Sequence, residues 1–153
     1  MPQLMDQPYP FELLLTPGKV TLVHEAYMQA RHIPTGRRAQ DEDPDPTFNG
    51  HSIGWWEDGT LVIDTVGLVP QVELEDGVPH SDKVHIVERA RLAQPDLLEI
   101  RTVVTDPEVL AKPWDYVTRY ARRRGWSITE YVCEQNNHDD VDSTGRLGQR
   151  LQP

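Results

Sequence analysis

Several features are scarce in this 153-residue chain. It has a single cysteine, Cys133, which excludes an intrachain disulfide and a zinc site built from cysteines. No apolar run approaches the roughly 18 residues of a membrane-spanning helix, and the N-terminus lacks the basic and apolar segments of a signal peptide. As written, the sequence therefore predicts a cytoplasmic protein with no membrane partner. An exported precursor with its signal removed would have the same sequence.

Basic residues are also few, with 15 Lys and Arg against 25 Asp and Glu, which gives a net charge of -10. Proteins that bind nucleic acid need a basic footprint, so we expect no nucleic-acid partner. The sequence contains no dinucleotide fingerprint, phosphate-binding loop, Gly-x-Ser-x-Gly elbow or His-Glu-x-x-His motif. It therefore predicts no cofactor, and hypotheses about function depend on polar residues inside strands.

The chain does contain β-patterned segments separated by turn residues. The clearest is residues 50–67, in which Asp58-Gly59 separates two β-rich runs and predicts a hairpin. Residues 19–27 form another predicted strand with Val20, Leu22 and His24 on one face, continuing irregularly through 31–33. Further strands are predicted at residues 83–92, 97–105, 114–121 and 126–133.

These segments predict an all-β, antiparallel fold with about eight strands. Closure into a lipocalin-like (calycin-type) barrel removes exposed strand edges and leaves room for one small ligand, whereas a β-sandwich is the alternative. We expect an N-terminal arm over residues 1–18, the barrel over 19–137 and a loose polar tail over 138–153.

Carboxylates inside the predicted strands are the first candidates for chemistry. Asp64 is the best of them, because aspartate is disfavoured in strands and here follows the apolar run 61–63 directly. Glu88 and Glu130 are further candidates, although a mid-strand glutamate is more often solvated. Two such groups facing a barrel interior would have perturbed pKa values and could act as general acid and base.

Histidines are the second set of candidates. His51, His80 and His85 are expected to meet near one barrel mouth as proton-transfer partners of the carboxylates. No spacing among them requires a metal, so none is predicted. Half-exposed histidines bound to loop backbone are the structural alternative.

For substrate binding, Glu25 and Arg31 are predicted to anchor a polar group, with Trp56 and Tyr131 as apolar walls. An aromatic wall suits a small hydrophobic or aromatic organic molecule. The alternative for such aromatic residues is ordinary packing in the core or at the rim.

Residues 50–68, GHSIGWWEDGTLVIDTVGL, resemble the GHSxGxWEGDTLVVDTxGF signature of a large, mostly uncharacterised bacterial family. The resemblance extends over roughly residues 8–137, and its further matches lie at residues 8–12, 16–18, 80–81, 84–89, 106–107, 112–114 and 130–137. It implies a lipocalin-like β-barrel that is often exported, and it implies no particular activity. The chain departs from the pattern at four places: Trp55, Asp58-Gly59, Leu68 and Gln135.

The sequence thus predicts a small β-barrel enzyme that performs cofactor-independent acid–base chemistry, of isomerase, lyase (dehydratase) or cyclase type, on a largely apolar substrate. A non-catalytic carrier or sensor of a small hydrophobic ligand is the first alternative. An accessory subunit or interaction module is the second. A homodimer is compatible with all three.

Overall fold

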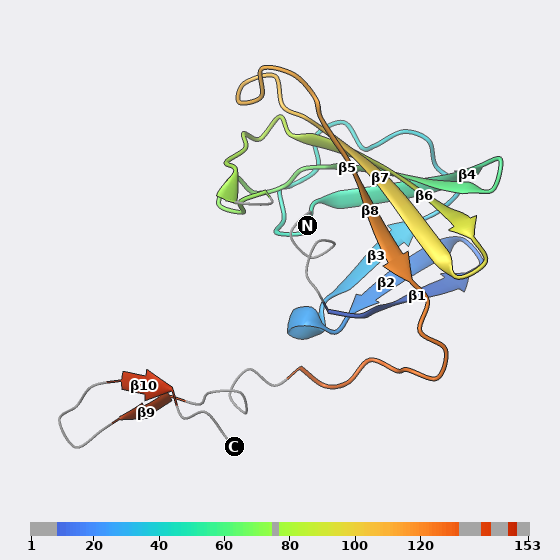
Figure 1. The fold of residues 1–153 in the computed structure, drawn as a ribbon. Helices are drawn as coiled ribbons and strands as arrows, with labels where there is room; N and C mark the ends of the chain where they lie inside the picture. The colour runs from blue at the N-terminus through green and yellow to red at the C-terminus, as the bar shows by residue number, and fades with distance from the viewer. Residues whose placement is uncertain (1–8, 75–76, 132–138, 142–146, 150–153) are drawn as a thin grey trace.

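The computed structural model describes residues 9–74, 77–131, 139–141 and 147–149. These residues form antiparallel strands with one short 3-10 turn, and the described part contains no α-helix (Figure 1). The predicted all-β, antiparallel class is confirmed.

The strands belong to three sheets. The first sheet contains β1 (Phe11–Thr16), β2 (Lys19–His24) and β3 (Ala30–Pro34). The second contains β4 (His51–Glu57), β5 (Thr60–Val66), β6 (His85–Gln94), β7 (Leu97–Thr105) and β8 (Trp114–Ala121). In the predicted tail, β9 (Asp139–Val141) pairs with β10 (Leu147–Gln149).

The first sheet begins inside the predicted N-terminal arm, since β1 pairs with β2 along six positions. The predicted strand at residues 19–27 ends earlier, at His24, and 31–33 belong to the separate strand β3. The reason is a reversal of the chain for which the sequence shows no turn signal. Tyr27 and Met28 adopt φ of 55° and 50° without a glycine, which turns the chain back on itself.

The hairpin of β4 and β5 is present as predicted. Asp58 and Gly59 both have positive φ, 46° and 77°, as a tight two-residue turn between twisted strands requires. Gly54 lets β3 approach this hairpin closely, because a Cβ there would lie 2.9 Å from Cγ2 of Ile33. Thr35 then makes a single parallel bridge to Gly54.

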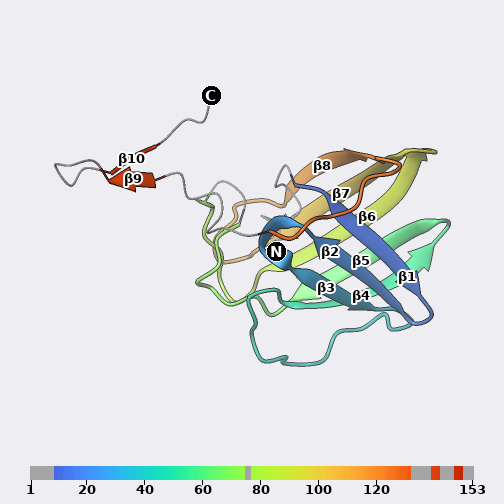
Figure 2. The same cartoon turned by 90° about the horizontal axis from the view of Figure 1, so that it is seen from below.

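The two larger sheets face each other around a shared interior (Figure 2), but the described strands do not close into a hydrogen-bonded barrel. In the described part of the chain no ladder joins β3 to β4, where Thr35, just after β3, makes that isolated bridge, and no ladder joins β1 to β8. Phe11 and Tyr120 cover this second seam with a perpendicular ring contact at 4.9 Å. The arrangement is as consistent with an open sandwich as with a barrel.

The strand predicted at 126–133 is absent over residues 126–131, and Cys133 lies outside the described residues. This segment runs beside the 3-10 turn, where the Glu25 carboxylate accepts hydrogen bonds from the backbone N–H and the hydroxyl of Thr129. A side chain therefore occupies a backbone donor that a ladder would have used.

Two apolar clusters fill the interior. The first lies between both sheets and contains Val20, Leu22, Ile33, Leu61, Ile63, Ala90 and Ile100. The second contains Leu68, Leu74, Val84, Ile86 and Val104, and it is packed against Val78, Leu110, Trp114 and Tyr116. Between the clusters, inward positions of β5, β6 and β7 carry Thr65, Glu88 and Thr102, all buried.

Candidate functional site

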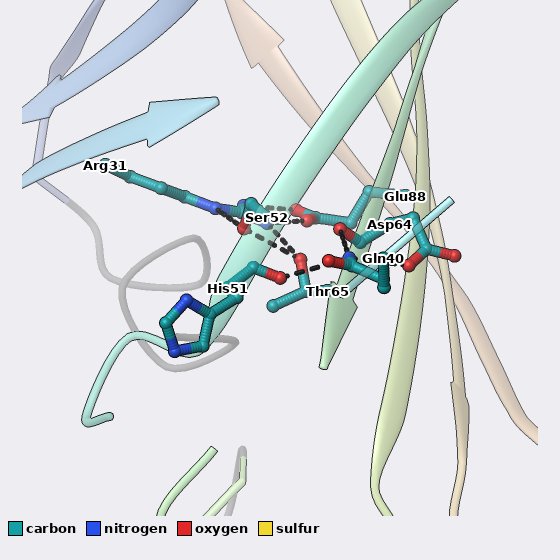
Figure 3. Close-up of polar contacts among 7 residues, drawn as sticks. All are labelled: Arg31, Gln40, His51, Ser52, Asp64, Thr65 and Glu88. Atoms are coloured by element: carbon teal, nitrogen blue, oxygen red, sulfur yellow. Dashed lines mark hydrogen bonds and ion pairs between the residues drawn. The ribbon is translucent and has the colours of Figure 1, made fainter. Parts of the chain in front are cut away.

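The polar residues of β5 and β6 divide between the two faces of the sheet, because side chains alternate along a strand. Thr65 and Glu88 point into the interior, whereas Asp64 and His85 lie on the outer face. Figure 3 shows the polar contacts around Arg31, Glu88 and Asp64.

On the outer face, Asp64 and His85 form a carboxylate–imidazole pair. Asp64 is directly opposite Val87 in the ladder, so His85, two residues before Val87, is its diagonal neighbour. The distance from His85 Nε2 to Asp64 Oδ2 is 2.7 Å. His85 remains 42% exposed, whereas Asp64 is 17% exposed. The pair is thus anchored on the carboxylate side and open on the imidazole side.

Gln40 fixes the carboxylate from the loop between β3 and β4. Its Nε2 donates to Asp64 Oδ1 and to the Asp64 carbonyl, both at 2.8 Å, and lies 3.2 Å from the His51 carbonyl (Figure 3). One amide side chain therefore ties the loop between β3 and β4 to both strands of the hairpin. Gln40 was not among the predicted site residues, because its role depends on a contact with Asp64, 24 residues along the chain.

Opposing effects set the charges of this pair. Burial acts to raise the pKa of Asp64, but hydrogen bonds from His85 and Gln40 outweigh it and hold that pKa below its usual value. The hydrogen bond to Asp64 raises the pKa of His85 against the opposing effect of burial. Both shifts favour an ionised Asp64 that supports a proton on the imidazole.

In the interior, Arg31 and Glu88 form a second pair, with both side chains 4% exposed. Arg31 Nη1 donates to Glu88 Oε1 at 3.0 Å, and Nη2 donates to the other carboxylate oxygen. The guanidinium also donates to Ser52 Oγ at 3.1 Å and to Thr65 Oγ1 at 2.8 Å. Because both carboxylate oxygens are engaged, Glu88 is suited to hold Arg31 rather than to exchange protons.

His24 belongs to the same interior but was not among the predicted site residues. It is 2% exposed, and its Nε2 has no hydrogen-bond partner among the described residues. Burial, with the Arg31 charge, lowers its pKa to about 4. Its place on the Val20–Leu22 face was visible in the strand pattern. The missing signal was Arg31, which pairs with Leu22 and so lies diagonally beside His24.

The other predicted histidines fix loops. His51 Nε2 lies 2.7 Å from the Asp45 carbonyl, and His80 is buried, with Nδ1 2.7 Å from the Ser81 carbonyl. Ser81 in turn donates to the carboxylate of Asp106 through its backbone N–H at 2.7 Å and its hydroxyl at 2.8 Å. Neither histidine is among the partners of Asp64 described above.

The remaining predicted residues lie elsewhere. Tyr131 packs against Tyr9 and Tyr27 at ring distances of 5.6 and 5.4 Å, and Glu130 beside it is exposed. Glu25 binds Thr129 near this aromatic group, whereas Trp56 is half exposed near the end of β4. The structure therefore joins Asp64 to His85 and Arg31 to Glu88, but it does not join Glu25, Glu130 or Tyr131 to either pair.

No set of three or more His, Cys, Asp or Glu side chains converges as metal ligands within the residues that the structure describes. In that same part, no helix is long and apolar enough to cross a membrane.

Comparison with protein-family models, curated proteins and solved structures found no match for this chain.

Proposed function

We propose that this protein is a cofactor-independent acid–base enzyme of lyase or isomerase type, built on a lipocalin-like β scaffold. The observation that carries the proposal is the half-exposed His85 imidazole, 2.7 Å from a carboxylate that Gln40 holds in place. In this arrangement His85 is the catalytic residue, and Asp64 and Gln40 are positioning residues.

The hydrogen bond assigns the proton of the neutral imidazole. An ionised Asp64 accepts from Nε2–H, so Nδ1 carries the lone pair that removes a proton from the substrate. The resulting imidazolium is stabilised by the carboxylate and can return the proton to another substrate atom, which is an isomerisation. If a neighbouring bond breaks instead, the same proton removal leads to elimination. The raised pKa of His85 suits a base that works near neutral pH.

The surroundings of His85 favour an uncharged substrate. Val66, Val87 and Val103 lie half-buried on the same face of β5, β6 and β7, and Val87 pairs directly with both Asp64 and Val103. These side chains offer apolar contact to a small organic molecule while the imidazole reaches its acidic proton.

A base-promoted elimination with a neutral aromatic probe, 5-nitrobenzisoxazole, tests this proposal. The base removes the proton on carbon, the C–H electron pair completes a nitrile, and the N–O bond breaks to give a phenolate. We expect the protein to accelerate this reaction above buffer, with a rate that rises as His85 loses its proton. His85→Gln should reduce the rate by about 100-fold, the usual contribution of a positioned base.

The matched control is His32→Gln, which removes an exposed histidine from β3 in the other sheet and should leave the rate unchanged. If His85→Gln turns over the probe at the wild-type rate, His85 is not the base and the proposal is wrong.

A further inference from the structure

The interior polar layer, which contains Arg31, Glu88 and His24, lies on the opposite face of the five-stranded sheet from the Asp64–His85 pair. Arg31 and Glu88 satisfy each other there with help from Ser52 and Thr65. Beside them, His24 Nε2 is buried without a hydrogen-bond partner in the described part of the chain. Most buried polar groups in proteins are paired, so we expect a hydrogen-bonding partner for this ring nitrogen beside the ion pair.

The charges in the interior polar layer limit which kind of ligand group could bind His24 Nε2. The Arg31 guanidinium is compensated by the Glu88 carboxylate, and burial lowers the pKa of His24 to about 4, so the imidazole is neutral at neutral pH. A charged ligand group would add an uncompensated buried charge. A hydroxyl group both donates and accepts, so it can complete His24 Nε2 in either tautomer of the ring.

The contacts of Phe11 indicate where a ligand could enter and which aromatic rings it would contact. Its ring lies 5.5 Å from the His24 ring at 31° and 4.9 Å from the Tyr120 ring at 89°. Phe11 and Tyr120 face each other across the seam between β1 and β8, where no ladder joins the described strands. Among the described residues no backbone ladder crosses this seam, so a change of the Phe11 side-chain rotamer would move its ring away from His24 without breaking a backbone hydrogen bond of either sheet.

We propose that the seam between β1 and β8 admits a small, neutral, aromatic ligand, whose hydroxyl group binds His24 Nε2 beside the Arg31–Glu88 pair. The aromatic body of the ligand packs against Phe11 and Tyr120. This site is independent of the proposed catalytic site, and it goes beyond the proposed function by adding a second ligand position inside the fold.

The experiment compares two probes that share one ring system and differ by a hydroxyl group, 1-naphthol and naphthalene. Binding is followed by fluorescence titration and by long-range proton–nitrogen NMR spectra of the imidazole rings. We expect 1-naphthol to bind about 10-fold more tightly, the effect of one additional hydrogen bond. It should shift the His24 Nε2 resonance and leave the resonances of His85 in place. His24→Phe should reduce the preference for 1-naphthol to less than about threefold.

The matched control is His32→Phe, which makes the same substitution at an exposed position of the same sheet and should retain the full preference. Equal binding of both probes to the wild type, or an undiminished preference in His24→Phe, would overturn the proposal. So would a His24 resonance that ignores both probes, because an ordered water molecule would then complete the ring. If His24→Phe does not fold, the wild-type resonances decide the question alone. Failure here would leave the rate measured with His85 variants unaffected, so the two proposals can fail separately.

Discussion

Two carboxylate–cation pairs lie on opposite faces of the same sheet, and they differ in almost every physical respect. Arg31 and Glu88 are both 4% exposed, and the guanidinium and the carboxylate bind each other through two hydrogen bonds. Asp64 and His85 share one hydrogen bond, and the imidazole is 42% exposed. The comparison shows that the local sequence places a carboxylate on a strand, whereas the environment decides whether it supports the fold or a proton transfer.

The buried pair should dominate stability. Glu88→Gln leaves the Arg31 charge in the interior without its counter-charge, so the free energy of unfolding should fall by about 3–5 kcal/mol. Urea unfolding followed by tryptophan fluorescence measures the loss. Asp64→Asn is the matched control on the outer face and should cost about 1 kcal/mol or less. Equal losses in the two variants would remove the distinction between the two faces.

The contributions of His24 and His85 to stability should also depend oppositely on pH. The pKa of His24 is lowered to about 4 from 6.5, so the unfolded chain binds more protons between these values, and stability falls as the pH drops from 6.5 towards 4. The pKa of His85 is raised, so its contribution is complete below pH 6.5 and is lost as the pH rises through the folded value.

The free energy of unfolding measured from pH 4.5 to 9 separates these contributions. His24→Gln should flatten the acid side of the curve, and His85→Gln should flatten the alkaline side. His32→Gln, at an exposed position, should reproduce the wild-type curve. A His24→Gln protein that loses stability on acidification as steeply as the wild type would show that His24 does not drive the acid limb.

A smaller effect is expected from the carboxylate partner of His85. Asp64→Asn replaces the ionised acceptor of the His85 hydrogen bond with a neutral amide oxygen, so the pKa of His85 should move down towards its ordinary value. NMR titration of the ring protons measures the change. The pKa of His24, which lies on β2 of the other sheet, should not follow. A His85 pKa that stays at its wild-type value in Asp64→Asn would show that the pair is not coupled in solution.

The smallest effect should come from Gln40→Ala. The variant removes the hydrogen bonds from Gln40 to Asp64 at a partly exposed site, at a cost of about 1 kcal/mol or less. Because the Gln40 hydrogen bond helps to lower the pKa of Asp64, that pKa should rise in the variant. A carbon-detected NMR titration of the aspartate carboxylates checks the direction, and an unchanged Asp64 pKa would contradict the role assigned to Gln40.

The features that depend on a local signal were predicted correctly. Asp58-Gly59 predicted the β4–β5 turn, and the predicted face with Val20, Leu22 and His24 is buried in the structure. A turn that lacks its usual residues was not predicted. Tyr27 and Met28 adopt left-handed φ values without glycine, so β2 and β3 were predicted as one irregular strand.

For the candidate sites, the sequence predicted the residues of both pairs but not which of these residues contact each other. Asp64 and His85 were both candidates, but the 2.7 Å contact depends on the register of β5 against β6. Arg31 and Glu88 were assigned different roles, as substrate anchor and acid–base group, because nothing local joins residues 57 positions apart. His24 becomes a candidate site residue only when both its strand face and its neighbour Arg31 are known.

The sequence by itself determined the all-β class, the central hairpin and the face on which each strand residue lies, since turn chemistry and a two-residue period are local properties of the chain. Only the tertiary structure decided that β1 and β8 meet through side chains without a ladder. The tertiary structure also decided which carboxylate is buried with a guanidinium and which meets an accessible imidazole. Exposure and charge pairing arise from segments far apart in the sequence, so no local pattern encodes them.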